Sequence, residues 1–240
     1  MNKYLSILLQ ICLGIFLADV FTGTGHWIED SYIDYCVDIP FLSEIAKDNE
    51  LHHYFPRSIL SCSYLENIAF TIPITITFLI LLFLIKPSIF SKYPYFIVMF
   101  FITSVSANIL HRFSHMRDCE NVWIVRTLQK VGIICRHQHH SMHHTLGDQK
   151  YCSILEHTNT LLDTLLLWRG LEMIVYLFTG IKPSRKGNYE DYNSIHNYMH
   201  ENTKLECPDK PTSQDVELLR QKLKNYKQCQ SIEIGLWNIS

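Results

Sequence analysis

The side chains in this sequence most able to do chemistry are its thirteen histidines. Imidazole is the commonest metal ligand in proteins and also carries protons near neutral pH. The densest group lies in RHQHHSMHH, residues 136–144, where His140, His143 and His144 form an HxxHH pattern. In a helix this spacing places imidazoles on one side over successive turns. Neutral histidine makes a poor charged patch at pH 7, so the pattern predicts a metal site rather than a basic surface.

Three further histidine groups precede this one. His111 and His115 are four residues apart, which on a helix lets both rings reach one metal. His52 and His53 form a doublet, and His26 follows Gly23 and Gly25, where we expect the chain to turn at a membrane surface. Two metals need about eight ligands, which the four groups supply together. The candidate ligands in these groups are His26, His52, His53, His111, His115, His140, His143 and His144, with His137 and His139 beside the last three.

Apolar runs must position these groups. Residues 4–21, 68–85 and 93–110 are each long and apolar enough to cross a bilayer, and the last two are joined by a short polar turn. Three crossings would put residues 22–67 and everything after His111 on one side, so that all the histidines share one face. The predicted fold is therefore an all-α integral membrane protein. Residues 122–135 and 161–178 are expected as interfacial helices, the second also being a candidate for a fourth crossing.

The charges around these runs predict an orientation. The histidine-bearing side carries six basic residues after the third run, against three on the other side, so the positive-inside rule places it in the cytosol. We expect an endoplasmic reticulum membrane. Residues 1–183 are predicted to form the membrane-embedded domain and residues 184–240 a polar tail, with one helix over residues 215–226 capped by Thr212 or Ser213. His196 and His200, in the tail, are expected to face solvent.

Composition excludes some function classes and leaves others open. A net charge of −2 and a pI near 6.7 give no field to attract nucleic acid. Eight cysteines without a CxxC pair are expected as reduced thiols. A membrane metal transporter or sensor is the non-enzyme alternative, although the run over residues 68–85 lacks the charged groups of a transport path. Haem is a second rival, but its histidines would lie inside facing spans rather than at span ends.

The metal itself follows from the surroundings of the site. An imidazole-rich, thiolate-free ligand set suits iron, zinc or copper equally. A site at a bilayer surface faces unactivated hydrocarbon, which O₂ chemistry at a redox metal can attack. These properties favour iron.

Several motifs resemble those of the Kua-type lipid desaturases, a family that includes plasmanylethanolamine desaturase and a plastid trans-3-palmitate desaturase. The resemblance runs from about residue 17 to residue 183 and begins with an ADxxxGxxHWxxD element from Ala18 to Asp30. His52-His53 is similar to the family's second doublet. Residues 108–115 resemble its NxxHxxSH element, residues 140–144 its HxxHH element, and residues 168–183 its closing segment. Some relatives have a further histidine where this chain has Gly132.

The resemblance implies a non-haem diiron centre, O₂ as cosubstrate, and electrons from a protein such as cytochrome b5 or ferredoxin. It implies that the eight histidines named above are ligands. Asp30 would be a ligand or would hold a ligand in place, and Asn108 would fix the orientation of an imidazole.

The predicted function is O₂-dependent desaturation of a membrane phospholipid, in which two hydrogens leave neighbouring carbons. The favoured substrate is a 1-O-alkyl chain that becomes a vinyl ether. Desaturation of a phospholipid acyl chain is the close alternative, and hydroxylation is a third possibility because the same oxidant can deliver oxygen instead.

Overall fold

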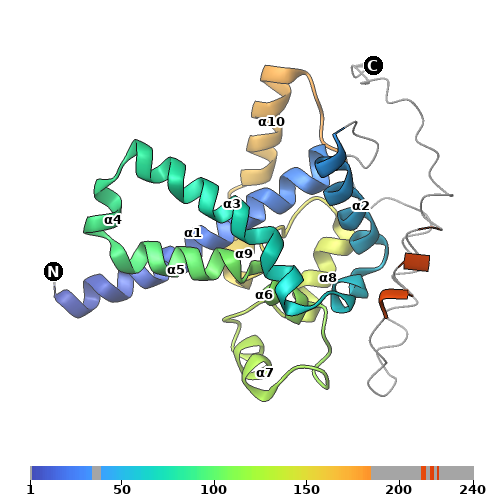
Figure 1. The fold of residues 1–240 in the computed structure, drawn as a ribbon, viewed down its shortest axis with the longest axis horizontal. Coiled ribbons are helices and arrows are strands. Elements are labelled where there is room, and N and C mark those ends of the chain that lie inside the picture. Colours follow the sequence, from blue (N-terminus) through green and yellow to red (C-terminus); the bar gives the residue numbers. More distant parts are fainter. Residues whose placement is uncertain (1, 34–38, 185–211, 215–216, 219–220, 222–240) are drawn as a thin grey trace.

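Helices make up the architecture, and no strand occurs among the residues that the computed structural model describes, which are 2–33, 39–184, 212–214, 217–218 and 221. The all-α prediction is confirmed for this part of the chain. The elements are α1 (Lys3–Tyr32), α2 (Pro40–Tyr54), the 3₁₀ helix η1 (Pro56–Ser61), α3 (Tyr64–Ile85), α4 (Ser88–Lys92), α5 (Pro94–Val105), α6 (Ala107–Ser114), α7 (Trp123–Lys130), α8 (His137–Leu146), α9 (Glu156–Thr164) and α10 (Leu167–Thr179). Helices α1, α3 and α5 form an elongated bundle, and α2, α6 and α8 gather at the end remote from α4 and the N-terminus (Figure 1).

The bundle contains the three predicted apolar runs. Helices α1 and α3 are each long and apolar enough to cross a membrane. The third run is broken, because α5 and α6 meet at a bend of 51°, and it counts as a span only if the pair is taken together. Residues 161–178 divide into α9 and α10 at Leu166, whose φ is 52°. Helix α10 has 13 residues, about 20 Å, which is short of the ~30 Å of a bilayer core, so the candidate fourth crossing is not found there.

Helix α1 corrects one expectation, because it does not turn at Gly23 and Gly25 but continues to Tyr32. Its 30 residues extend about 45 Å. Gly23 serves packing instead of a turn: a Cβ there would lie 2.6 Å from the sulfur of Cys152. The last two turns of the helix therefore carry His26 and Asp30 rigidly, at a spacing that faces both side chains the same way.

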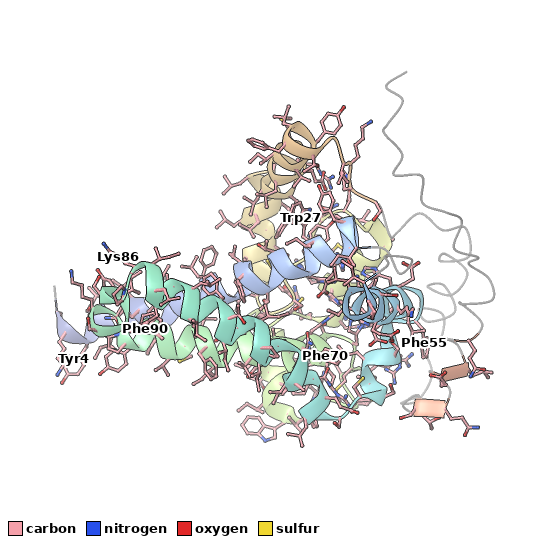
Figure 2. All side chains as sticks on the ribbon, turned by 45° about the horizontal axis from the view of Figure 1, so that its top comes forward. Tyr4, Trp27, Phe55, Phe70, Lys86 and Phe90 are labelled. Carbon is pink, nitrogen blue, oxygen red and sulfur yellow. The ribbon has the colours of Figure 1, made fainter. Side chains whose placement is uncertain are left out.

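Close packing fixes the position of α1 along the bundle. A Cβ at Gly14 would lie 2.8 Å from the carbonyl oxygen of Phe96 on α5, so only glycine allows this approach. The rings of Phe21, Phe78 and Phe100 cluster with centroids 4.7–5.5 Å apart. Figure 2 shows the side chains of this bundle, with Tyr4, Lys86 and Phe90 at the end remote from Trp27 and Phe55. This packing sets the register between α1 and the helix that leads into α6.

Two arginines hold the segment after α2 against α6. Arg57 donates two hydrogen bonds to the carboxylate of Glu120, at 2.9 and 2.8 Å, and both side chains are buried. Arg112 donates to the carbonyl oxygens of Ile59 and Leu60, each at 3.1 Å, and to that of Cys62. Since a buried guanidinium is costly unless its donors are satisfied, these bonds link the end of α2 firmly to α6.

Carboxylates hold α8 and the loop before α9. Glu156 accepts hydrogen bonds from the backbone N–H and from the side chain of Arg136, which precedes α8. Asp19 of α1 is fully buried and accepts the backbone N–H groups of Ile154 and Leu155, at 3.1 and 3.0 Å. The loop that precedes α9 is thereby attached to the middle of α1.

Two expectations outside the bundle have mixed outcomes. Cys12, Cys62, Cys135 and Cys152 are free as predicted, but the expectation of a reduced thiol is wrong for Cys119, which is disulfide-bonded. Disulfide pairing depends on which cysteines the fold brings together, and sequence spacing does not show this. Most of the predicted C-terminal helix lies outside the described residues, although those described within it are helical.

Candidate metal centre

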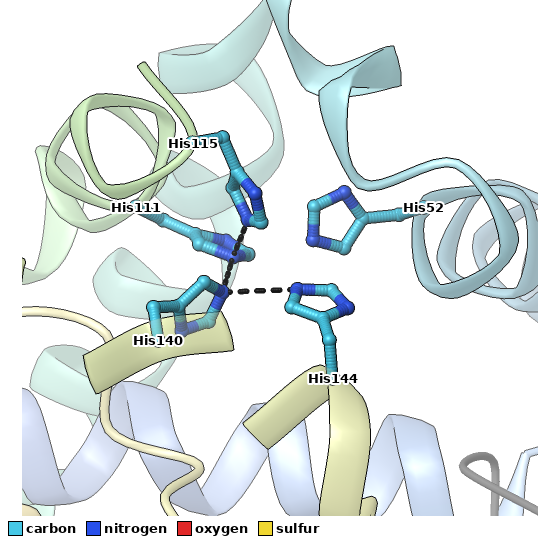
Figure 3. A group of neighbouring side chains, drawn as sticks. All are labelled: His52, His111, His115, His140 and His144. Carbon is cyan, nitrogen blue, oxygen red and sulfur yellow. Dashed lines mark hydrogen bonds between the residues drawn. The ribbon is translucent and has the colours of Figure 1, made fainter. Parts of the chain in front are cut away.

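Five histidines from three helices face one another at the end of the bundle. Each ring offers one nitrogen as a possible ligand atom, and these five nitrogens all lie within 4.8 Å of one another. We call this set the five-histidine group. Its members are His52, His111, His115, His140 and His144 (Figure 3).

The contacts within this group fit a bound cation. The Nε2 atoms of His115, His111, His140 and His144 follow one another at 3.0, 2.7 and 3.1 Å. Each nitrogen of a neutral imidazole holds either one hydrogen or one lone pair, so it can take part in one hydrogen bond. The Nε2 atoms of His111 and His140 each have two such neighbours, so these three contacts cannot all be hydrogen bonds. A metal ion between them would accept every lone pair.

His52 gives a second indication at the same place. It is 8% exposed, and neither of its ring nitrogens has a hydrogen-bond partner among the described residues. A buried polar group without a partner costs about 1–3 kcal/mol. Its ring lies 4.6–4.8 Å, centroid to centroid, from those of His111, His115 and His144. A metal held by this group would satisfy one of the two nitrogens.

A second group adjoins the first and contains a carboxylate. His26, Asp30, His53 and His143 also offer ligand atoms within 4.8 Å of one another, and we call them the aspartate group. The Nε2 atoms of His53, His143 and His26 lie 2.9, 3.2 and 3.6 Å from the Asp30 carboxylate oxygens. Asn49 donates to Oδ1 of Asp30 at 2.8 Å. The carboxylate is 1% exposed and therefore depends on these neighbours.

The tautomers in the aspartate group also favour a metal. The Nδ1 of His143 lies 2.8 Å from the carbonyl oxygen of Gln149, and that of His26 lies 3.0 Å from the carbonyl oxygen of Tyr151. A carbonyl oxygen only accepts, so each Nδ1 carries the hydrogen and each Nε2 of the neutral ring carries a lone pair. Those lone pairs face the Asp30 carboxylate. Only a proton or a metal cation makes this arrangement favourable, and a carbonyl acceptor behind the ring is typical of metal-bound histidine.

Burial disfavours the protonated alternative in the neighbouring group. Burial first, and neighbouring imidazoles second, hold the pKa of His52, His140 and His144 well below the ordinary 6.5. These rings are therefore neutral at pH 7 and present lone pairs. The donor set of the two groups, eight imidazoles and one carboxylate, fits iron, zinc or copper.

Helical spacing explains how four short motifs supply two groups. The pairs His111/His115 and His140/His144 are four residues apart, and each pair enters the five-histidine group. The adjacent residues His52 and His53 point in directions about 100° apart on α2, and they separate into different groups. His143 and His144 separate in the same way on α8. Each doublet therefore contributes one histidine to each group. The two groups lie side by side, since the ring centroids of His53 and His144 are 4.8 Å apart.

The structure brings together all eight histidines that the sequence singled out, with Asp30. It places Asn108 elsewhere: its amide donates to the carbonyl oxygen of Asn67 at 3.4 Å and so connects α6 to α3. Asn108 thus acts on the helix rather than on a ring in this geometry.

The remaining histidines lie outside both groups. His137 contacts the carbonyl oxygen of Ser114, and His139 contacts the amide of Asn159. His157 is exposed, 3.5 Å from where a Cβ on Gly132 would be. His196 and His200 fall outside the described residues.

The sequence did not predict the residues and carbonyl oxygens that hold the ligands in place. Asn49 gave no signal, because it lies in a polar segment and its contact with Asp30 is made only by the fold. The carbonyl groups of Tyr151 and Gln149 belong to the backbone, which carries no residue signature. Asp19 could have been found, since a carboxylate late in an apolar run needs a buried partner.

Comparisons with known proteins relate the chain to a family and to several relatives. A lipid desaturase domain model matches residues 15–186. The chain is 31% identical over 183 residues to a probable fatty acid desaturase of Acanthamoeba polyphaga mimivirus, covering 74% of this chain and 86% of that relative. It is 26% identical over 172 residues to the chloroplastic fatty acid desaturase 4 of Arabidopsis thaliana, covering 71% and 52%. It is 25% identical over 186 residues to plasmanylethanolamine desaturase 1 of Mus musculus, covering 74% and 68%.

The extent of these matches differs between relatives. The chain spans about half to two thirds of the length of the Arabidopsis relatives. No solved structure matches the chain.

Proposed function

Because this chain belongs to the lipid desaturase domain family, we propose that it is an O₂-dependent diiron enzyme that introduces a double bond into a phospholipid hydrocarbon chain. The observation that carries the proposal is the convergence of eight imidazoles and one carboxylate in two adjoining buried groups. The five-histidine group would hold one iron and the aspartate group the other. Asp30 is proposed as a ligand.

When bound, a pair of iron ions would supply the oxidising power that removes two hydrogens from neighbouring carbons with the consumption of O₂. The residues of the chain do the rest. The carbonyl oxygens of Tyr151 and Gln149 fix the tautomers of His26 and His143, so that their Nε2 lone pairs point inward. All the proposed ligands except His26, whose side chain is 11% exposed, are buried, which excludes water and limits side reactions. The α1, α3 and α5 bundle would deliver the hydrocarbon chain from a bilayer.

The proposed substrate is the 1-O-alkyl chain of an ether phospholipid, which would become a vinyl ether. The mouse relative, whose name specifies a plasmanylethanolamine substrate, supports this choice. A fatty acyl chain is the second candidate, and it is favoured by the higher identity to the viral relative and by the plant relatives, all named as fatty acid desaturases.

We propose that the enzyme is integral to the endoplasmic reticulum membrane and receives electrons from a carrier such as cytochrome b5 or ferredoxin on the cytosolic side. The basic residues after α6 support that side. The disulfide at Cys119 argues for the opposite, lumenal side, because disulfides persist in an oxidising compartment. Labelling an introduced cysteine at Gln138, which is exposed on α8, with a membrane-impermeant maleimide before and after permeabilisation would decide the orientation. Labelling of sealed microsomes, whose cytosolic face is outward, supports the cytosolic side.

Lipid mass spectrometry of cells that express the chain tests the proposed reaction. Acid-labile vinyl ethers in the wild type, absent with His111→Ala or His143→Ala, are the expected result. New acyl double bonds would indicate the second substrate. Hydroxylated lipid would indicate that the enzyme hydroxylates its substrate instead of desaturating it. Unchanged lipids in cells whose purified protein binds metal would contradict the enzyme and favour a transporter or sensor.

A further inference from the structure

A row of oxidisable aromatic side chains leads away from the aspartate group. The ring centroids of His143 and Tyr151 are 5.1 Å apart, those of Tyr151 and Trp168 5.0 Å, and those of Trp168 and Trp27 6.2 Å. Trp27 in turn lies 5.3 Å from Tyr32. Tyr151, Trp168 and Trp27 are 0, 2 and 4% exposed, whereas Tyr32 is partly exposed. The row therefore connects the buried site with the surface of the protein.

Core packing accounts for the burial of these rings, which form an apolar cluster with Cys152 and Leu162. One of these rings, Trp168, also has a charged hydrogen-bond partner. The indole N–H of Trp168 donates to the carboxylate of Asp163 at 3.1 Å. A carboxylate at this position can take the proton that an indole releases when it loses an electron, which makes the loss easier. The backbone carbonyl of Tyr151 also holds the ring of His26.

The phenylalanine cluster of the bundle lacks these features. Phe21, Phe78 and Phe100 pack in the bundle, and phenylalanine is much harder to oxidise than tyrosine or tryptophan. Readily oxidised rings thus lie next to the metal-binding groups, and the rings in the bundle cluster are resistant.

We propose that Tyr151, Trp168 and Trp27 form an electron-transfer chain that returns electrons to the metal site when O₂ has been activated without a lipid C–H bond in reach. The proposal rests on the proposed function. It assigns to this core a protective role, because an oxidising equivalent left in the site would otherwise attack the ligand histidines.

The electrons and protons balance as follows. Reducing O₂ to two waters takes four electrons and four protons. In productive turnover the external donor supplies two electrons, the two C–H bonds of the lipid supply two more with their protons, and the solvent supplies the other two protons, as it also does without lipid. Without lipid, the aromatic chain supplies the last two electrons one at a time. Trp168 gives its electron through Tyr151 and its indole proton to Asp163, and Trp27 refills Trp168. Thiols at the surface, two oxidised to one disulfide, restore Trp27 through Tyr32 and release the two protons required.

Electron paramagnetic resonance of the full-length, iron-loaded protein tests this chain. The reduced protein is mixed with O₂ in the absence of lipid and frozen within milliseconds to seconds. We expect an organic radical whose spectrum narrows when the protein contains ring-deuterated tryptophan. Trp168→Phe should lower the radical yield by about tenfold or more, because electron transfer to the site would become slower by about that factor. It should also increase the oxidation of ligand histidines, measured by peptide mass spectrometry.

Two further variants keep the test decisive. Trp123→Phe is the matched control, because Trp123 is 69% exposed and lies outside the row, and it should leave the radical unchanged. Asp163→Asn keeps an acceptor for the indole N–H but removes the proton acceptor, so it should lower the radical yield even if Trp168→Phe fails to fold. Wild-type radical yields in Asp163→Asn and in a folded Trp168→Phe with full iron content would overturn the chain. Protein that binds iron and desaturates lipid but forms no tryptophan radical would overturn it as well, leaving the proposed function intact. Protein without iron or without desaturated lipid would refute the proposed function instead.

Discussion

Replacing Asp30 by asparagine should remove metal from one group and spare the other. The substitution keeps the size of the side chain but removes the charge that faces the Nε2 atoms of His53, His143 and His26 at 2.9–3.6 Å. Loss of a group that only orients a ligand costs about 10–100-fold in metal affinity, so loss of the carboxylate itself should cost about 100-fold or more. That factor corresponds to about 2.8 kcal/mol, at about 1.4 kcal/mol for each decade. Asp30 does not belong to the five-histidine group, so that group should keep its metal.

The assay is a competition titration of the purified protein with a chelator, followed by iron analysis per chain. We expect the wild type to hold about two irons and Asp30→Asn about one at chelator concentrations that leave the wild type loaded. Asp148→Asn is the matched control, since it makes the same chemical change at a partly exposed ion pair with Arg169. Two irons bound with wild-type affinity in Asp30→Asn would refute the assignment of Asp30 as a ligand.

Two further perturbations test the structure around the site. Gly23→Ala should lower the free energy of unfolding by about 1–3 kcal/mol, because its Cβ would meet Cys152 at 2.6 Å, whereas Gly25→Ala, with open space at that position, should be neutral or slightly stabilising. Chemical denaturation in detergent compares the two, and equal stabilities would contradict the close packing. The metal-free protein should also lose stability as the pH falls below about 6.5, because the pKa of His52, His140 and His144 is lowered in the folded state. Above that pH the rings are neutral in both states, and below it the unfolded chain binds protons that the folded chain does not. Thermal unfolding of the metal-free protein between pH 8 and pH 5 measures this, and a flat profile would count against neutral buried imidazoles.

Local spacing was enough to find the paired candidate ligands, whereas His26 and Asp30 were singled out by the family resemblance. Pairs four residues apart, such as His111 and His115, must face one way on a helix, and this geometry does not depend on the rest of the fold. Spacing could not assign His52 and His53 to different groups, because that depends on which helices pack against each side of α2. The sequence could therefore predict which histidines converge but not their division into five histidines and a carboxylate-containing set.

The errors have a common physical cause. Glycine permits a turn and also permits close packing, and at Gly23 the approach of Cys152 from a segment about 130 residues away decides between them. The bend between α5 and α6 and the disulfide at Cys119 likewise depend on contacts between distant segments. Apolar length predicted the apolar parts of α1 and α3, though not the extension of α1 to Tyr32, because it depends on composition alone.

The most direct test of the proposed two-metal desaturase is conversion of a defined lipid by purified protein. The iron-loaded protein is supplied with a reductant, its electron carrier, O₂ and an ether phospholipid deuterated along the alkyl chain. We predict loss of two hydrogen isotopes from neighbouring carbons with one O₂ consumed for each double bond, and no product from either His111→Ala or His143→Ala, one change in each group. Product formation by both variants, or by protein that holds zinc and no iron, would contradict the account.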